Sequence, residues 1–528
     1  MRRGRLAGAA WFAATAWSAA PPQAAFAQSA LEERVSVEAP QPPDAPLPVP
    51  RIGSIDLAIA AAYEHNPQLL AQRAQVRAGD ARYAQARALY GPTISFSGTY
   101  GYALDSVDVR PGLTQRSSGW SGTASAVLSQ PLYTSGRLRS GVLAAEADIA
   151  FRRQSLRLVE SEVLLGVYSA YIGVRRDREL LRIVTENLDL LRLQLSQSED
   201  RFGVREITIA DLDQVRARVG LGSANLESAR ASLSVAGGRF LQFVGALPGE
   251  ELAPLPAGAP SMPRSLEEAY AIAERESPLL LVAHARERIS RAQVKQARAE
   301  LGPTVSAQGS AARGAVQPYS NDLNQTQLRG GVTISWPLYT SGLNDARIRE
   351  TEEINQADWR LIDQALRDLR AEVEANWDQH VAARASVEHL RAAVLAAARA
   401  YDGAVLQERA GARTTFEVLD LLRDLLTVRS QLVAAETSAE LARYGLLAAM
   451  GRLEAPQLVD GVVPYAPGDN LQRVRTMTDA PPITPMVEAL DSIGIGRNTG
   501  PRPYRDPAAG IVPPGLATPA DPATPTAD

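Results

Sequence analysis

The hexapeptide PLYTSG occurs twice in this chain, at Pro131–Gly136 and at Pro337–Gly342. The copies lie 337 − 131 = 206 residues apart, which is far longer than one unit of a solenoid repeat. Two earlier motifs also recur: NPQLL returns as SPLLL and GPTIS as GPTVS, both at an offset of 302 − 91 = 211 residues. The chain is therefore a duplicated half-molecule. We expect one structural repeat at residues 52–247, a second at 264–453, and a linker at 248–263.

Each PLYTSG lies between a stretch that alternates in polarity and a stretch with helical periodicity. A proline has no N–H to donate to a sheet, so strand pairing should end at this motif. Its tyrosine can lie at a membrane–water interface, and its glycine allows the backbone to turn into a helix. We therefore expect two strand-to-helix junctions, formed by Pro131, Tyr133, Gly136, Pro337, Tyr339 and Gly342.

Segments of about 10 residues before these junctions alternate in polarity, as transmembrane β-strands do. They are Thr93–Leu104, Ser118–Gln130, Thr304–Arg313 and Gln327–Trp336. A soluble β-sandwich would show the same alternation. Aromatic residues near the strand ends, such as Tyr100 and Trp120, favour a membrane instead. The connecting loops, 105–118 and 314–326, are then expected on the outer face of that membrane.

A very long helix should follow each junction. No proline occurs between Arg137 and Val204, and about 68 helical residues would span ~100 Å. Apolar residues recur every seven positions at Leu181, Leu188 and Leu195, and the same spacing returns 206 residues later. A second segment with heptad spacing follows each long helix. This pattern predicts two antiparallel helical hairpins with coiled-coil packing.

The two ends of the chain differ from these repeats. The N-terminus has a basic segment, an apolar run and the small-x-small sequence Ala25-Phe26-Ala27, which are typical of a secretory signal peptide. A membrane anchor is the alternative, but the apolar run is short for a span of roughly 20 residues. We expect residues 1–27 to be a cleaved signal peptide and 28–51 a disordered leader rich in Pro and Ala. Residues 454–528 should be a largely disordered, Pro-rich tail.

The composition excludes several functional classes. The net charge of −4 gives no basic footprint for nucleic acid. Cysteine is absent, which excludes disulfides and thiolate metal sites, and the four histidines show no metal-ligand spacing. The sequence contains no nucleophile elbow and no phosphate loop, which disfavours an exported enzyme. We expect no catalytic residues, no cofactor and no metal.

The internal repeat, the Asn-Pro and Gly-Pro-Thr signals, PLYTSG and the two hairpin tips together resemble the TolC-type outer-membrane channel family, over about residues 55–453. Four strands cannot close a barrel alone, because about eight are needed and lipid tolerates no open sheet edge. The resemblance implies a mainly α protein with β-structure that forms a homotrimer. Its protomers would share a transmembrane barrel of 3 × 4 = 12 strands, continued by a coiled-coil α-helical barrel.

The function implied by this resemblance is a passive exit duct in the outer membrane that extends into the periplasm. It would serve a tripartite efflux pump or a type I secretion system. Its partners would be a periplasmic adaptor, an inner-membrane transporter of the RND or ABC class, and outer-membrane lipid. A non-conducting structural coiled coil of the cell envelope is the alternative, but it would not need four amphipathic strands.

The hairpin tips read RFGVREITIADL and ERAGARTTFEVLD, and each contains a capping box, Thr208-x-x-Asp211 and Thr414-x-x-Glu417. By the resemblance, the periplasmic gate comprises Arg413, Glu417, Asp420 and Asp211. The adaptor-docking residues would be Val204, Arg205, Glu206, Gly411 and Ala412. Two positions depart from the family pattern: Glu408 replaces a tyrosine and Arg205 replaces a glycine. The choice of adaptor could therefore differ from that of the best-known members.

Overall fold

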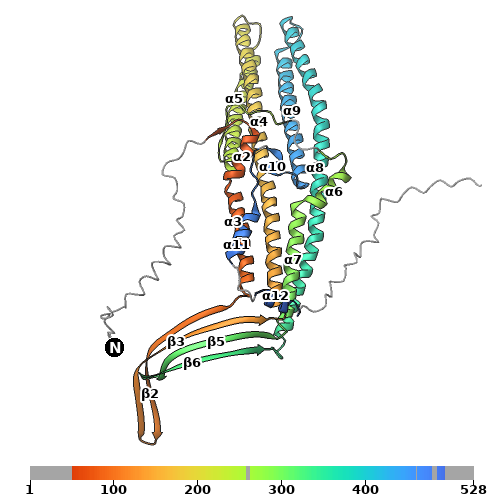
Figure 1. Cartoon of the computed structure of the whole chain (residues 1–528). Coiled ribbons are helices and arrows are strands. Elements are labelled where there is room, and N and C mark those ends of the chain that lie inside the picture. Colours follow the sequence, from red (N-terminus) through yellow and green to blue (C-terminus); the bar gives the residue numbers. More distant parts are fainter. Residues whose placement is uncertain (1–49, 257–261, 460, 478–483, 494–528) are drawn as a thin grey trace, which may run out of the picture. The chain divides into compact units, whose positions relative to one another are not determined.

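The computed structural model describes residues 50–256, 262–459, 461–477 and 484–493. The predicted signal peptide, the leader up to residue 49 and the end of the tail lie outside this part. The described chain is mainly helical with one four-stranded sheet (Figure 1), which agrees with the predicted mainly α composition and with four strands per protomer.

Both repeats place their elements in the same order. The first contains α2 (Ile55–His65), α3 (Pro67–Ala88), β2 (Thr93–Arg110), β3 (Leu113–Tyr133), α4 (Arg137–Gly203) and α5 (Ile209–Val244). The second contains α6 (Leu266–Glu276), α7 (Pro278–Ala299), β5 (Thr304–Gln317), β6 (Ser320–Ser335), α8 (Leu343–Arg409) and α9 (Thr415–Ala449). Two short strands, β1 (Arg51–Ile52) and β4 (Leu247–Pro248), pair in parallel where the first repeat begins and ends.

The four-stranded sheet is antiparallel throughout, in the order β2-β3-β5-β6. Its strands are 18, 21, 14 and 16 residues long, so they extend well beyond the alternating segments. The prediction of loops at 105–118 and 314–326 is therefore wrong, because most of these residues belong to the hairpins β2–β3 and β5–β6. A strand ladder needs only backbone donors and acceptors, so polar sequence without alternation can continue it.

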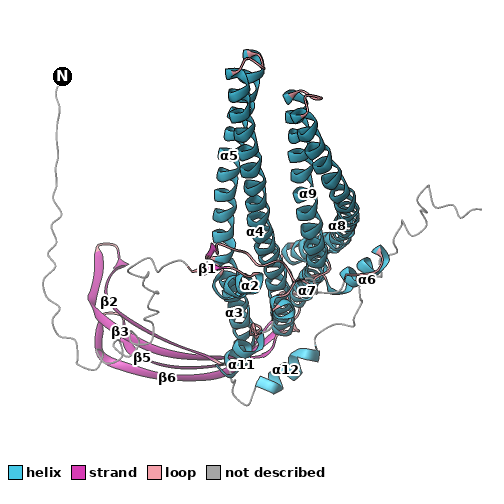
Figure 2. Cartoon of the chain, turned by 90° about the horizontal axis from the view of Figure 1, so that it is seen from above, coloured by secondary structure: helices cyan, strands magenta, loops and turns pink. Residues whose placement is uncertain are grey.

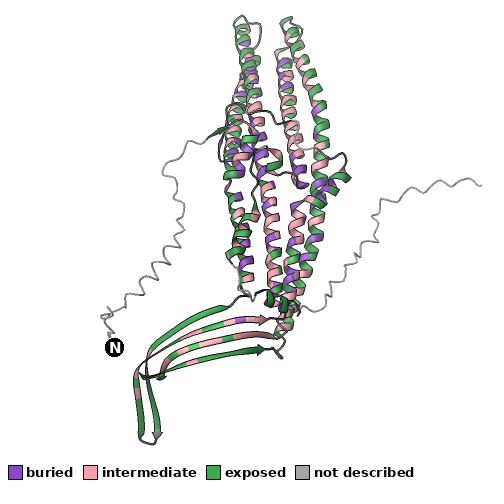
Figure 3. Cartoon of the chain, in the orientation of Figure 1, coloured by how far each residue is buried: buried purple, intermediate pink, exposed green. Residues whose placement is uncertain are grey.

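One face of this sheet is apolar and open. Ile94, Phe96 and Ile334 are 77%, 76% and 70% exposed, and Tyr100 stacks on Trp120 with ring centroids 5.4 Å apart. Burial colouring shows β2 and β6 largely exposed and the inner strands β3 and β5 mixed between exposed and intermediate, whereas buried residues are concentrated in the helices (Figure 3). In the described chain, the outer edges of β2 and β6 have no strand partner.

The long helices form the two predicted hairpins, with α5 beside α4 and α9 beside α8 (Figure 2). α4 and α8 each have 67 residues, close to the length expected from the absence of proline. The main core lies where α4 and α9 meet the shorter helices, and Tyr168 stacks there on Tyr444 at 3.7 Å between ring centroids. Nearer the tips, a smaller cluster joins the hairpins, formed by Leu191, Val215, Leu419 and Leu422.

The tail contains three helices, α10 (Ala455–Leu458), α11 (Pro467–Met477) and α12 (Thr484–Ile493). α11 packs against α3, and α12 packs against β3 and α4. The prediction of a largely disordered tail is therefore wrong for these segments. The proline content suggested disorder, but prolines fall at the starts of these helices, where the missing N–H costs no hydrogen bond.

Candidate functional site: hairpin tips and strand-to-helix junctions

The two tips have the same backbone. At the first tip the N–H of Glu206 donates to the carbonyl of Arg201 at 2.9 Å, and at the second the N–H of Ala412 donates to the carbonyl of Gln407 at 2.8 Å. Each turn places one residue at positive φ, Arg205 at 64° and Gly411 at 74°. A side chain is disfavoured at this φ, so Arg205 occupies a position better suited to glycine.

All five predicted adaptor-docking residues are exposed at these tips. They comprise Val204, Arg205 and Glu206 at the first tip and Gly411 and Ala412 at the second. Val204 is 75% exposed, which is unusual for a branched apolar side chain, and it therefore offers a contact point at the end of the first hairpin.

The first predicted capping box is complete and the second is partial. Thr208 Oγ1 accepts the N–H of Asp211 at 3.2 Å, and the Asp211 carboxylate accepts the N–H of Thr208 at 3.0 Å. Hydrogen bonds from the hydroxyl and the backbone of Thr208 lower the pKa of Asp211. Thr414 likewise accepts the N–H of Glu417 at 3.4 Å, but the described contacts include no return bond from the Glu417 side chain.

Of the two remaining predicted gate residues, Asp420 is ion-paired and Arg413 is exposed to solvent. Asp420 accepts a bond from Arg218 of α5 at 3.1 Å and lies 3.6 Å from Arg423. Asp420 thus joins the two hairpins inside one protomer. Arg413 is exposed, and its guanidinium makes no ion pair within the described ranges. Asp211 lies on the other hairpin, where its carboxylate accepts the hydroxyl of Thr208 in the cap of α5.

Glu408, the residue at the position of the family tyrosine, has a structural role that the sequence did not predict. Its side chain is only 7% exposed. It accepts hydrogen bonds from Thr415 Oγ1 at 2.7 Å and Gln194 Nε2 at 3.0 Å, and Arg201 lies at 3.4 Å. This carboxylate therefore fastens α4 to α8 and α9 just below the tips. The departure from tyrosine was the available signal, because a buried carboxylate needs partners.

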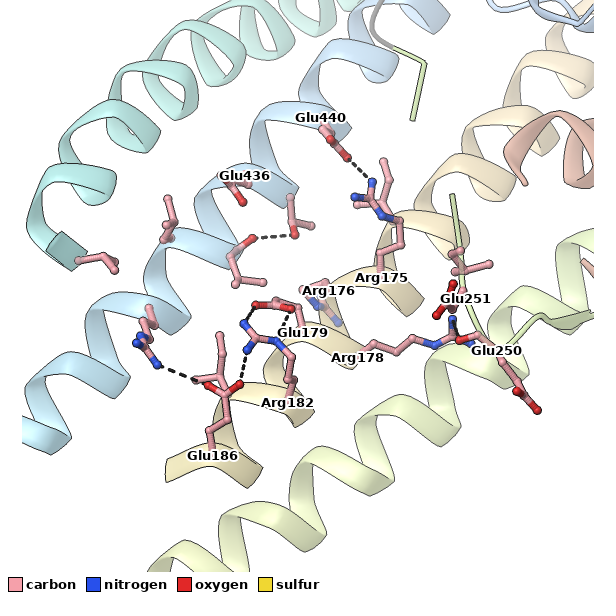
Figure 4. A pocket seen from close by; sticks show the side chains of 18 residues that line it. Arg175, Arg176, Arg178, Glu179, Arg182, Glu186, Glu250, Glu251, Glu436 and Glu440 are labelled. Atoms are coloured by element: carbon pink, nitrogen blue, oxygen red, sulfur yellow. Dashed lines mark hydrogen bonds and ion pairs between the residues drawn. The ribbon is translucent and has the colours of Figure 1, made fainter. Parts of the chain in front are cut away.

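A charged cavity of about 820 Å³ lies between α4 and α9, on the side of the Leu191 cluster away from the tips. Figure 4 shows its charged side chains. Arginines and glutamates both line it: Arg182 bonds to Glu179 and Glu186, and Arg175 lies 3.9 Å from Glu440. The lining contains five arginines and six glutamates, so opposite charges nearly balance and give the cavity little power to select an ion or substrate. We interpret it as a seam between the hairpins.

The expectation that strand pairing ends at the proline of PLYTSG holds for Pro337 and is wrong for Pro131. β6 ends at Ser335, whereas β3 continues to Tyr133 through a shift in register. A bulge of this kind lets a strand pass a residue that cannot donate. Tyr133 is half-buried, whereas Tyr339 is 86% exposed.

After each strand, a left-handed glycine starts the long helix: Gly136 has φ 86° and Gly342 has φ 80°. Neither has a side chain to cap the helix. At the first junction the buried carboxylate of Asp491 in α12 replaces that cap. It accepts the N–H groups of Thr134 at 2.7 Å, Gly136 at 3.0 Å and Arg139 at 3.2 Å. The tail therefore fixes the first junction.

The profile of the outer membrane efflux protein family matches residues 58–245 and 269–452. The chain belongs to this family. Each matched segment lies within one predicted repeat, in agreement with the duplication. As a member of the family, the chain is an outer-membrane efflux protein rather than an enzyme, and its place is the outer membrane.

Curated relatives and solved structures support this assignment. The chain is 32% identical to the outer membrane efflux protein BepC of Brucella suis, over 79% of this chain and 90% of BepC. It is 23% identical to the outer membrane protein TolC of Escherichia coli, over 84% of this chain and 93% of TolC.

Two solved channels share the fold at low identity. The CmeC outer membrane channel of Campylobacter jejuni superposes with a TM-score of 0.67 at 12% identity, covering 80% of this chain and 89% of CmeC. The MtrE outer membrane channel of Neisseria gonorrhoeae superposes with a TM-score of 0.62 at 18% identity, covering 76% and 90%.

Among the described residues, no helix combines the length and apolarity that a membrane crossing requires. No group of three or more His, Asp or Glu side chains is placed there to hold a metal ion.

Proposed function

We propose that three copies of this chain form a passive exit duct, in which four strands from each copy close a transmembrane barrel and the helical hairpins continue the duct through the periplasm. The observation that carries this proposal is the sheet. It has an exposed apolar face, and within the described chain its two outer edges, on β2 and β6, have no strand partner. A sheet edge in lipid leaves backbone groups unpaired at a cost of several kcal/mol each, so the edges must pair with other copies.

The duct would serve a tripartite efflux pump or a type I secretion system. A periplasmic adaptor would dock on the exposed tips, at 204–206 and 411–412, and an inner-membrane transporter of the RND or ABC class would supply the energy. These tip residues are solvent-exposed and belong to the end of the molecule farthest along the hairpins from the sheet. Arg205 in place of the family glycine would alter which adaptor fits.

The tips would also gate the duct. In this proposal Arg413 of one protomer pairs with an acidic group at a neighbouring tip, Asp211 being the first choice. Glu417 and Asp420 would form an anionic ring that favours cations. The exposed guanidinium of Arg413 is available for such a pair. Glu408 would hold the two hairpins of one protomer together, so that the gate opens by their separation.

Native mass spectrometry of the detergent-extracted protein tests the assembly. We expect three times the mass of the mature chain. A stable monomer that stays folded would contradict the proposal, because its sheet edges would then be satisfied without partners. A coiled-coil protein without a channel is the second candidate function, and it would leave the apolar face of the sheet unexplained.

A further inference from the structure

The two repeats preserve their hydrogen bonds as well as their motifs. Thr93 pairs with Ser129 in the first hairpin and Thr304 with Ser335 in the second, which are the same positions after offsets of 211 and 206 residues. The side chains of the residues just before the two PLYTSG motifs also make equivalent hydrogen bonds. Gln130 donates to the carbonyl of Tyr90 at 2.9 Å, and its counterpart Trp336 donates to the carbonyl of Leu301 at 3.1 Å. The offsets therefore transfer contacts from one repeat to the other.

The two halves of the protomer meet along β3 and β5. In this seam Ser129 lies opposite Gln308 and Leu128 opposite Gly309. At its end, Ser135 Oγ donates to the carbonyl of Pro303 at 2.7 Å.

The fit at the end of the seam is close. A Cβ added to Gly302 would lie only 2.4 Å from the Cβ of Ser135, so glycine is required at this position. Ser135 is buried there, with a φ of 54°.

The counterpart of Ser135 in the second repeat, Ser341, makes no such contact within the described chain. Ser341 adopts the same backbone as Ser135, with a φ of 51°, but it is exposed. Within the described chain its hydroxyl has no partner. The counterparts of Pro303 and Gly302 are Pro92 and Gly91, beside the open edge of β2 at the opposite side of the sheet. Among the described residues, each protomer therefore has an unpaired Ser341 hydroxyl at one side of its sheet and the equivalent acceptor, the carbonyl of Pro92, at the other side.

We propose that the seam between neighbouring copies repeats the seam inside each copy. This inference rests on the proposed function and specifies its interface. Ser341 Oγ of one protomer donates to the carbonyl of Pro92 of the partner subunit, and Gly91 of the partner subunit leaves room for it. β6 pairs antiparallel with β2 of the partner subunit, and Ser335 lies opposite Ser97, because Ser129 lies opposite Gln308 inside the protomer.

The side-chain pattern supports this register independently. The same offsets place Ile334 opposite Gly98 and Val332 opposite Tyr100, so apolar residues of both edges share one face. Ser335 and Ser97 share the other face. A slip of one residue would bring the apolar set of one strand onto the polar face of its neighbour, which lipid would not tolerate.

Engineered disulfides test the register, and the absence of native cysteine makes the result unambiguous. The matched variant carries Ser335→Cys and Ser97→Cys. The control carries Ser335→Cys and Thr99→Cys, which lie on the same face but one pair along. Opposite residues have Cβ atoms about 4.5–5.5 Å apart and diagonal ones about 7–8 Å, whereas a disulfide needs about 3.5–4.5 Å. Oxidised membranes should give covalent dimers and trimers several-fold faster with the matched pair.

The outcomes separate this inference from the proposed function. A trimer by native mass spectrometry with faster cross-linking of the control pair would overturn the register and leave the duct intact. A monomer would overturn both. A second variant tests the junction itself: Gly91→Leu should lose trimer at concentrations where the wild type is fully trimeric, while the protomer stays folded. In the protomer the nearest atom to a Cβ at Gly91 is the Ala88 carbonyl at 3.3 Å. A fully trimeric Gly91→Leu protein would refute the junction contact.

Discussion

Replacing Glu408 by alanine should loosen the two hairpins near their tips. The carboxylate accepts bonds from Thr415 and Gln194 and faces Arg201, and it is only 7% exposed. Hydrogen bonds to a charged group contribute about 1.5–3 kcal/mol each, but Gln194 and Thr415 are only half-buried and can regain water. Arg201 also keeps a second partner, Glu206, at 3.1 Å. We therefore expect a net loss of about 2–3 kcal/mol in the free energy of separating the hairpins.

Hydrogen exchange of the tip amides measures this loss directly. A change of 1.4 kcal/mol is tenfold in an equilibrium constant, so residues 401–425 should exchange roughly 30–100-fold faster in the Glu408→Ala protein. Asp213→Asn is the matched control. Asp213 is 62% exposed, and its one ion pair among the described residues is with Arg216 on its own helix at 3.3 Å, so its loss should cost about 0–1 kcal/mol. Equal exchange rates in the two variants would refute the claim that Glu408 holds the two hairpins together near their tips.

Three further changes test the rest of the structure. Asp491→Asn should speed amide exchange at residues 134–139 by roughly tenfold, since a lost cap costs about 0.5–2 kcal/mol, and should leave 340–345 unchanged; equal effects at both junctions would contradict the capping role. Neutralising Asp420 as Asn should lower the cation preference of the channel while the trimer persists, and an unchanged reversal potential would remove it from the ring. A cysteine at Gln115, near the β2–β3 turn, should react with an impermeant maleimide in intact cells; reaction only after permeabilisation would reverse the topology.

The sequence predicted the features that depend on local pattern. The duplication, the long proline-free helices and the turns at Gly136 and Gly342 all follow from spacing and backbone preference, and the structure has them. Strand length was underestimated because ladder hydrogen bonds leave no signature in side chains once alternation stops. The passage of β3 through Pro131 was missed for a related reason: a bulge depends on the neighbouring strands.

Contacts between distant segments could not be predicted. Asp491 caps a helix that begins more than 350 residues earlier, as its bond to Gly136 spans 355 positions, and nothing in the tail sequence indicates that target. Glu408 showed only as a departure from a family pattern, and its partners lie on two other helices, α4 and α9. Gate residues on exposed tips are harder still, because their partners would belong to another protomer.

Single-channel recording of the purified protein in a planar lipid bilayer tests the central claim most directly. If three copies enclose a duct that narrows at the tips, the wild-type protein should give small, discrete conductance steps, and Arg413→Ser should give larger ones because the pair that holds the tips together is lost. Insertion of trimeric protein without any conductance, in the wild type and in Arg413→Ser alike, would contradict the claim that this chain forms a channel.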